Sequence, residues 1–279
     1  MREKYHWALP RTAVDLGERT AVMGILNITP DSFSDTSEYF DQDRAVARGK
    51  EIEQQGADII DVGGESTRPG NQLVSEEEET RRVIPVIEAL AAAVKIPISI
   101  DTWRSGVARR ALQAGAQIVN DISGLRFDSH LPAVIKEGRA AVVLMHSRGT
   151  RETLHSQPTM INPVHETIER LSDSIQTAKI AGIPAEAIVV DPGFGFGKNA
   201  EQSLKILKSL DEFSKLRYPL LVGTSRKSFI RSIIPDTQEA RTWGTAATVV
   251  IAIMNGAHII RVHDVRAGRL LADVTDQIL

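Results

Sequence analysis

Polar side chains stand at the ends of eight short apolar runs in the sequence, at 21–26, 57–62, 96–100, 116–119, 140–145, 187–190, 219–222 and 258–262. Within or just beyond these ends lie Asn27, Asp61, Asp101, Asn120, Asp121, Met145, His146, Asp191, Ser225 to Lys227, Arg261 and His263. Singly, each acid could be a helix cap or turn former, and His146 could be a structural histidine. If the runs are parallel strands of one barrel, these groups converge on a single mouth and form a site.

One set of these residues suits a flat heterocycle. Asp101, Asn120 and Asp191 offer carboxylate and amide groups to a ring with donor and acceptor edges, and Lys227 can donate to a ring carbonyl. The nearby stretch "GFGFGK" (193–198) matches neither the Walker pattern nor the dinucleotide fingerprint. It is interpreted as a flexible loop with Phe196 available for ring contact.

A second set suits phosphate. Arg261 and His263 lie two residues apart at the last run and would point the same way, where barrels often bind phosphate. The alternative for this pair is an ion pair at the strand end with Asp264. No His or acidic cluster has zinc-ligand spacing, so a metal, if present, is expected to be magnesium held largely by substrate phosphate.

The elements that position these residues repeat along the chain. The apolar runs are rich in Ile and Val and recur about every 33 residues, as in βα units covered on both faces. Eight such units predict an α/β fold, a single-domain (β/α)₈ TIM barrel over 21–279 with residues 1–20 as an N-terminal extension. An open doubly wound sheet would need a glycine-rich loop at its first crossover, and "NITPDSFSD" has no glycine.

The segments between the runs have helix signals. Ser75 and Glu78 form a capping-box pattern before a helical apolar stripe, although Pro85 weakens its early part. Several helices are predicted to end at a left-handed glycine, at Gly56, Gly115, Gly138, Gly182 and Gly256.

Composition excludes some classes of function. The 279 residues are 42% hydrophobic, and the net charge of -3 gives no global field for nucleic acid or an anionic membrane. There are no cysteines, hence no disulfide, thiolate metal site or cysteine nucleophile. Without a signal-like N-terminus or an apolar stretch of about 20 residues, a cytoplasmic protein is expected.

Eight motifs resemble those of the dihydropteroate synthase family, in order, from residue 22 to 265. They are "MGILNITPDSFSD", "DVGGESTRPG", "SIDT", "VNDISG", "VLMH", "VVDPGFGFGK", "LVGTSRKSFI" and "IIRVHDV". The resemblance implies condensation of hydroxymethyl-dihydropterin diphosphate with para-aminobenzoate, giving dihydropteroate and pyrophosphate in folate synthesis. It also implies a (β/α)₈ barrel, a homodimer and the use of Mg²⁺.

The resemblance assigns roles to matching residues. The pterin would be bound by Asp101, Asn120, Met145, Asp191, Phe196 and Lys227, and the diphosphate by Thr67, Arg261 and His263. Asn27 would coordinate magnesium. The aminobenzoate would lie against Phe33, Ser225 and Lys227, with its carboxylate near a helix start.

The mechanism expected from this assignment loses pyrophosphate before the amine attacks a delocalised pterin cation. Asp35 and Arg68, on the polar loops 27–40 and 63–75, are candidate catalytic groups together with Lys227, and the two loops would cover the mouth. After Asp35 the chain has Thr36, Ser37 and Glu38, where the family commonly has Gly-Gly. These residues have less backbone freedom than glycine, and Glu38 adds a charge to the first loop, three residues after Asp35.

Two other functions fit part of the pattern. A pterin-binding methyltransferase barrel would share the acids and amide of the ring site, but it would not need Arg261 with His263 or the two loops. A catalytically silent pterin-binding or regulatory subunit is the other alternative, and retention of both the pterin and the diphosphate sets argues against it.

Overall fold

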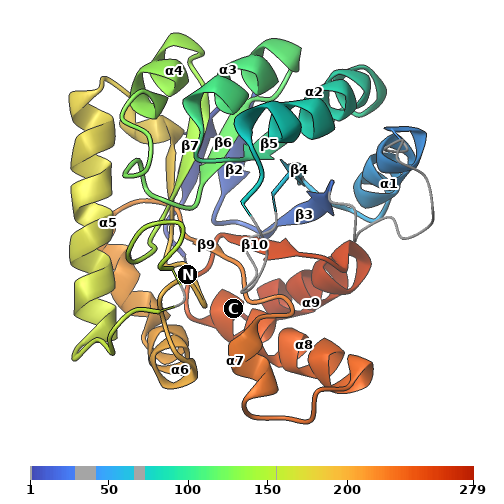
Figure 1. Ribbon diagram of the computed structural model, residues 1–279. Helices are drawn as coiled ribbons and strands as arrows, with labels where there is room; N and C mark the ends of the chain where they lie inside the picture. The colour runs from blue at the N-terminus through green and yellow to red at the C-terminus, as the bar shows by residue number, and fades with distance from the viewer. Residues whose placement is uncertain (1, 29–41, 66–72, 155) are drawn as a thin grey trace.

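The fold is a barrel of parallel strands with helices around its outside (Figure 1). The computed structural model describes residues 2–28, 42–65, 73–154 and 156–279. Its barrel strands are β3 (Ala21–Asn27), β4 (Ile59–Gly63), β5 (Ile98–Asp101), β6 (Ile118–Asp121), β7 (Ala141–Met145), β8 (Ile188–Asp191), β9 (Leu221–Val222) and β10 (Ile259–Val262). They are ordered β8-β7-β6-β5-β4-β3-β10-β9. A parallel bridge between Val190 and Leu220 joins the two ends. The predicted (β/α)₈ barrel is confirmed.

The barrel strands are buried along most of their length. Every residue of β4, β6, β7 and β8 is buried. Because helices cover the outside and side chains fill the inside, no face of these strands meets solvent, and Ile and Val run on without alternation. All eight apolar runs named above contain a strand, although the run at 219–222 gives one of only two residues.

The helices occupy the intervals between the strands, as Figure 1 shows. They are α1 (Gln42–Gln54), α2 (Glu76–Ala93), α3 (Ser105–Ala114), α4 (Leu131–Glu137), α5 (Pro163–Ile180), α6 (Ala200–Lys208), α7 (Ser228–Arg231), α8 (Gln238–Met254) and α9 (Val265–Ile278). Two 3₁₀ helices, η2 (Ala185–Ala187) and η3 (Leu210–Leu216), precede β8 and β9. Pro85 lies inside α2 and does not end it.

The predicted helix ends are mostly correct. Ser75 caps α2 by accepting from the Glu78 N–H at 3.2 Å, but the Glu78 carboxylate bonds Arg81 and Arg82 instead of closing a capping box. Gly56, Gly115, Gly182 and Gly256 have positive φ. The prediction for Gly138 is wrong: its φ is -74°, and the left-handed position is taken one residue later by Arg139, with φ 49°.

An antiparallel hairpin that the sequence analysis did not identify precedes the barrel. It pairs β1 (Tyr5–Ala8) with β2 (Ala13–Leu16). Trp7 is fully buried and donates its indole N–H to the carbonyl of Ala187 at 3.0 Å, just before β8. The hairpin therefore packs against the amino-terminal end of the barrel.

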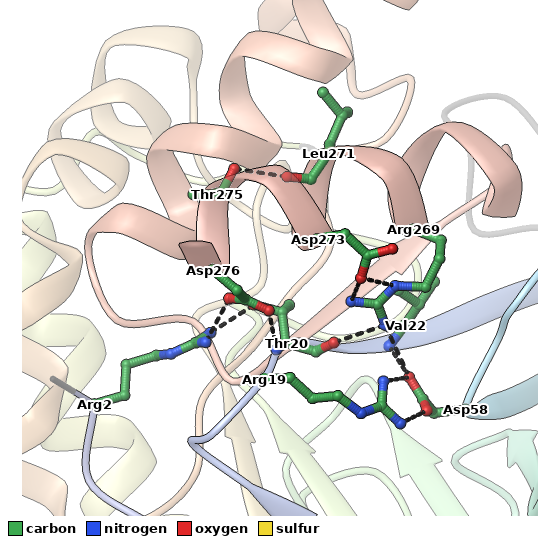
Figure 2. A network of polar contacts seen from close by, with 10 residues as sticks. All are labelled: Arg2, Arg19, Thr20, Val22, Asp58, Arg269, Leu271, Asp273, Thr275 and Asp276. Atoms are coloured by element: carbon green, nitrogen blue, oxygen red, sulfur yellow. Dashed lines mark hydrogen bonds and ion pairs between the residues drawn. The ribbon is translucent and has the colours of Figure 1, made fainter. Parts of the chain in front are cut away.

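Polar contacts at this same end tie the two ends of the chain together (Figure 2). Arg2 donates to Asp276 and to Thr20 Oγ1, both at 2.6 Å, and Asp276 also accepts from the Thr20 N–H. Beside them Arg19 and Arg269 contact Asp58, which precedes β4. In this fold the amino-terminal face serves stability, which leaves the carboxyl ends of the strands for chemistry.

Candidate active site

The carboxyl ends of β4, β5, β6 and β10 bring their polar side chains into direct contact. Arg261 on β10 donates through Nε to Asp61 Oδ2 and through Nη2 to Asp101 Oδ2, both at 2.6 Å. Asn120 Nδ2 donates to the same Asp61 oxygen at 3.0 Å. These strand ends therefore converge, as the barrel geometry required. Asp264 is not the partner of Arg261, because its side chain caps α9 by accepting from the Ala267 N–H.

Asp61 lies at the centre of this cluster; the sequence analysis placed it among the converging strand-end residues but gave it no role in binding the ring or the phosphate. Its side chain is fully buried, and its Oδ1 atom has no hydrogen-bond partner among the described residues. A buried acceptor without a donor is costly. The signal in the sequence was a second carboxylate, after Asp58, at the carboxyl end of the apolar run "ADIIDV". We interpret Oδ1 as an acceptor that is available to a ligand.

Asp191 and Lys227 occupy the other side of the mouth. Asp191 accepts from the Gly193 N–H at 2.7 Å, and burial raises its pKa to about 6. Burial and, to a smaller extent, the charge of Arg261 lower the pKa of Lys227 to about 8. Burial also raises the pKa of Asp101, against the attraction of Arg261. The pKa values of these three side chains are therefore closer to neutral pH than those of exposed aspartate and lysine side chains.

An apolar wall borders these charges. Met145 and Phe196 belong to one small buried cluster with Ile122 and Leu154. The ammonium of Lys227 lies 4.1 Å from the centre of the Phe196 ring, a cation–π contact. An aromatic ring and a thioether beside acids and an amide form the mixed surface that a planar heterocycle requires.

The loop carrying Phe196 is anchored by Lys198, a residue whose role the sequence analysis did not identify. The Lys198 ammonium donates to the carbonyls of Gly193 at 2.9 Å, His146 at 3.2 Å and Phe196 at 3.4 Å. The interpretation as a loop is correct, but these three bonds hold its backbone instead of leaving it free.

Ser225 and His263 lie against each other. His263 Nδ1 and Ser225 Oγ are 2.9 Å apart, and the His263 N–H donates to the same oxygen at 3.3 Å. His263, which is expected near the diphosphate, is therefore adjacent to Ser225, which is expected near aminobenzoate.

Four of the predicted site residues, Phe33, Asp35, Thr67 and Arg68, lie outside the described residues. The two described ends of the second loop are held by one side chain. Arg104 donates through Nη1 to Glu65 at 2.8 Å and through Nη2 to the Val74 carbonyl at 2.6 Å. Arg151 donates to the other oxygen of Glu65, at 2.6 Å.

Comparison with known proteins decides the family. The family model described as "Pterin binding enzyme" matches residues 23–263 of this chain. A dihydropteroate synthase of Synechocystis is 48% identical over 270 residues, covering 96% of this chain and 93% of that protein. The Bacillus subtilis dihydropteroate synthase is 44% identical, covering 96% and 92%. The chain belongs to the dihydropteroate synthase family.

Solved structures of dihydropteroate synthases agree with this assignment. A Clostridium difficile dihydropteroate synthase, determined in the presence of pteroic acid, has a TM-score of 0.89 and 45% identity, covering 95% of this chain and 98% of that one. The Xanthomonas albilineans dihydropteroate synthase in complex with 7,8-dihydropteroate has a TM-score of 0.85 and 38% identity, covering 95% of each chain. The resemblance identified in the motifs and the expectation of a transferase are confirmed.

Proposed function

We propose that this protein is a dihydropteroate synthase, which condenses hydroxymethyl-dihydropterin diphosphate with para-aminobenzoate. The observation that carries the proposal is the contact of Arg261 with Asp61 and Asp101 beside Asn120, at the carboxyl ends of the strands. A guanidinium next to acids and an amide can meet a diphosphate and a pterin edge at one place.

The pterin is assigned to the buried polar set and its apolar wall. Asp101, Asn120 and Asp191 accept from and donate to the ring edge, and Lys227 donates to the ring carbonyl. Met145 and Phe196 lie against the ring faces. Asp61, with its unpartnered Oδ1, is added to this set from the structure.

The diphosphate is assigned to Arg261, His263 and Thr67. Two nitrogens of Arg261 are bound to Asp61 and Asp101, and Nη1 has no partner among the described residues. Nη1 is therefore the donor open to a phosphate oxygen. Aminobenzoate is assigned to Phe33, Ser225 and Lys227. Since Ser225 contacts His263, the two substrates would meet there.

The reaction follows from the charges. Loss of pyrophosphate leaves a delocalised pterin cation, so Arg261 and His263 would stabilise the leaving group while nearby carboxylates stabilise the cation. A neutral aromatic amine needs no strong base. The site would act by positioning and by excluding water, with Asp35, Arg68 and Lys227 as the groups that touch the reacting atoms.

A magnesium ion fits the donor set at the end of β3. The position that a Cβ of Gly63 would take lies 3.6 Å from Asn27 Oδ1 and 3.8 Å from Asp101 Oδ2, so two hard oxygen atoms lie near each other at this strand end. No group of three or more His, Cys, Asp or Glu residues that could hold a metal occurs in the described ranges. We assign one ligand to Asn27 and others to the diphosphate. When bound, the ion supplies charge neutralisation at the leaving group.

The activity is tested by mixing purified protein with pterin diphosphate, Mg²⁺ and labelled aminobenzoate. We expect labelled dihydropteroate above the enzyme-free control, and much less when the metal is chelated. Absence of product with pterin still bound would favour the silent pterin-binding protein. Transfer of a methyl group from a folate, without any need for diphosphate, would favour the methyltransferase.

The pH profile gives a second prediction. The kcat/KM for pterin diphosphate should rise with pH through about 6, because Asp191 accepts the pterin N–H groups only when ionised. It should fall above about 8, as Lys227 loses its proton. Steady-state rates across this range test both limbs. In Asp191→Asn the acid limb should shift, leaving the part that Asp101 contributes, since burial also raises the pKa of Asp101. An unchanged acid limb in this variant would mean that Asp191 does not contribute to it.

We also propose a homodimer formed through α8 and α9. Both helices expose apolar residues in stripes: Trp243, Ile251 and Met254 on α8, and Leu270, Val274 and Ile278 on α9. Contiguous exposed apolar surface of this kind favours association. The proposal also has the support of the family resemblance.

Light scattering should give twice the chain mass for the wild type and the single-chain mass for the double variant Trp243→Glu, Ile251→Arg. The matched control is Ile161→Arg, since Ile161 is 96% exposed and precedes α5. A dimeric double variant would place the interface elsewhere.

No helix in the described residues has the length and apolar character needed to cross a membrane. We propose that the protein works in the cytoplasm on small-molecule substrates, without nucleic acid or membrane partners. The support is its near-zero net charge and its metabolic family.

A further inference from the structure

A second cavity lies beside the barrel, between the segment that follows β7 and the helix α5. Its volume is about 590 Å³. Its inner wall, on the barrel side, includes Arg126, His146 and Arg148, and α5 contributes Glu166, Glu169, Arg170 and Asp173. None of these residues belongs to the pterin, diphosphate or aminobenzoate sets, so the cavity needs an explanation of its own.

Neither of the two inner arginines, Arg126 and Arg148, is paired with a carboxylate of the described residues. Arg126 donates to the carbonyls of Ser123 at 3.0 Å, Ser147 at 2.8 Å and Gly149 at 3.2 Å. Its remaining bond is to the Ser147 hydroxyl, at 2.9 Å. Burial lowers the pKa of Arg126, although the charge of Asp121 opposes this. Partly buried guanidinium groups that contact only neutral oxygens retain uncompensated positive charge.

Arg148 has donors to spare. Both of its hydrogen bonds leave from Nη1, to the carbonyls of Pro158 and Gly197. Within the described part of the chain, its Nε and Nη2 atoms have no partner. A planar guanidinium with these two nitrogens available can bind an oxyanion through two parallel bonds.

His146 gives an independent indication. It is 5% exposed and lines the same cavity, yet its Nδ1 atom has no hydrogen-bond partner among the described residues. Burial and the charges of Lys198, Arg126 and Arg148 hold its pKa well below the usual range. The ring is therefore neutral in a positive environment, and its unused nitrogen is a polar group without the contact that buried groups normally make.

We propose that this cavity binds a small oxyanion, a carboxylate or phosphate group, between Arg126 and Arg148. The oxyanion would supply the negative charge that the inner wall lacks. On α5, three acids face one cation, Arg170, which is paired with Asp173 at 3.6 Å, so a ligand carrying several negative charges would be repelled on this side. The fitting ligand has one compact anionic group, with the rest of the molecule neutral or cationic.

The test is calorimetric titration of the apo-protein with inorganic phosphate and, separately, with acetate. Since phosphate can also bind at Arg261, each titration is repeated on Arg261→Ala protein that is shown to be folded by circular dichroism. We expect binding that survives Arg261→Ala and weakens at least about tenfold in Arg148→Met, the loss of one charge-assisted contact. Arg109→Met is the matched control, because Arg109 is an exposed arginine on α3 paired with Glu137.

Soaking of wild-type crystals tests the same proposal without depending on the folding of a variant. Wild-type crystals soaked in selenate should show anomalous density between Arg126 and Arg148, in addition to any at Arg261. Binding of phosphate alone would identify a phosphate ligand, and binding of acetate alone a carboxylate. The proposal is overturned if neither anion binds, if Arg148→Met binds as the wild type does, or if selenate leaves the cavity empty.

Discussion

Arg261→Ala should lower kcat/KM for pterin diphosphate by about two to three orders of magnitude, the loss typical of a donor aimed at developing negative charge. Two effects add in the same direction. The free Nη1 donor for the diphosphate disappears, and Asp61 and Asp101 lose the cation to which they are bound at 2.6 Å. These carboxylates are then expected to take up protons, because burial disfavours their charged forms.

Separate affinity measurements for pyrophosphate and for pterin show which substrate group loses binding in each variant. Pyrophosphate affinity, determined by calorimetry, should fall in Arg261→Ala and stay near the wild-type value in Asp101→Asn, where pterin affinity should fall instead. Arg266→Ala is the matched control, since Arg266 is exposed on α9 only five residues away. Unchanged pyrophosphate and pterin affinities in both variants would mean that these strand ends do not form the substrate site.

The barrel and the direction of its active face could be predicted because parallel strands leave simple traces in a sequence. A strand covered on both faces reads as an unbroken run of Ile and Val, and the residue that ends the run must lie at the mouth. Asp101, Asn120 and Arg261 were found in this way. The N-terminal hairpin left no such trace, because its strands YHWA and AVDL are only partly buried and form no run of Ile and Val, and Trp7 is buried by distant elements.

The pairing of the site residues could not be predicted, because it depends on register between strands far apart in the sequence. Arg261 contacts Asp61 and Asp101 across 200 and 160 residues, whereas its sequence neighbour Asp264 turns away to cap α9. Lys198 was overlooked for a similar reason. A lysine after a glycine-rich stretch suggests solvent or phosphate, and only the packed structure shows its ammonium inside a ring of carbonyls.

Arg104→Ala should have the largest effect on stability, a loss of about 3 to 5 kcal/mol in the free energy of unfolding, as expected when one partner of a buried ion pair is removed. Arg104 lies between two carboxylates, Glu79 at 1% and Glu65 at 6% side-chain exposure. It bonds both through Nη1. Without it, Glu79 has no ion-pair partner among the described residues, whereas Glu65 retains Arg151.

The pH dependence of this loss distinguishes a buried charge from lost packing. Burial already raises the pKa of Glu79, and the charge of Arg104 opposes that rise. In Arg104→Ala the pKa should rise further. A carboxyl group with a raised pKa in the folded state favours folding at low pH and loses that contribution as pH increases through the raised value. The loss in the free energy of unfolding caused by Arg104→Ala should therefore become smaller as the pH is lowered from 7 towards 5.

The free energy of unfolding is measured by urea denaturation at several pH values. The variants compared are Arg104→Ala, Arg104→Lys and the exposed control Arg110→Ala. Arg110 lies on α3, the helix that Arg104 precedes, and donates to the Thr80 hydroxyl at 3.2 Å. Arg104→Lys should recover part of the stability but not the bond to the Val74 carbonyl, since that bond uses the second arm of the guanidinium. If the loss were independent of pH and under about 1 kcal/mol, the network around Arg104 would contribute no more to stability than an ordinary surface ion pair.

The same variants separate stability from function. Arg104 joins Glu65 and Val74, the described residues on either side of Thr67 and Arg68, and so fixes where that loop leaves and re-enters the barrel. Arg104→Lys, if folded at the assay temperature, should therefore show a raised KM for pterin diphosphate with little change in its KM for aminobenzoate. Equal changes in both values would point to a general loosening of the mouth, and Arg104 would then have no particular connection to the diphosphate side.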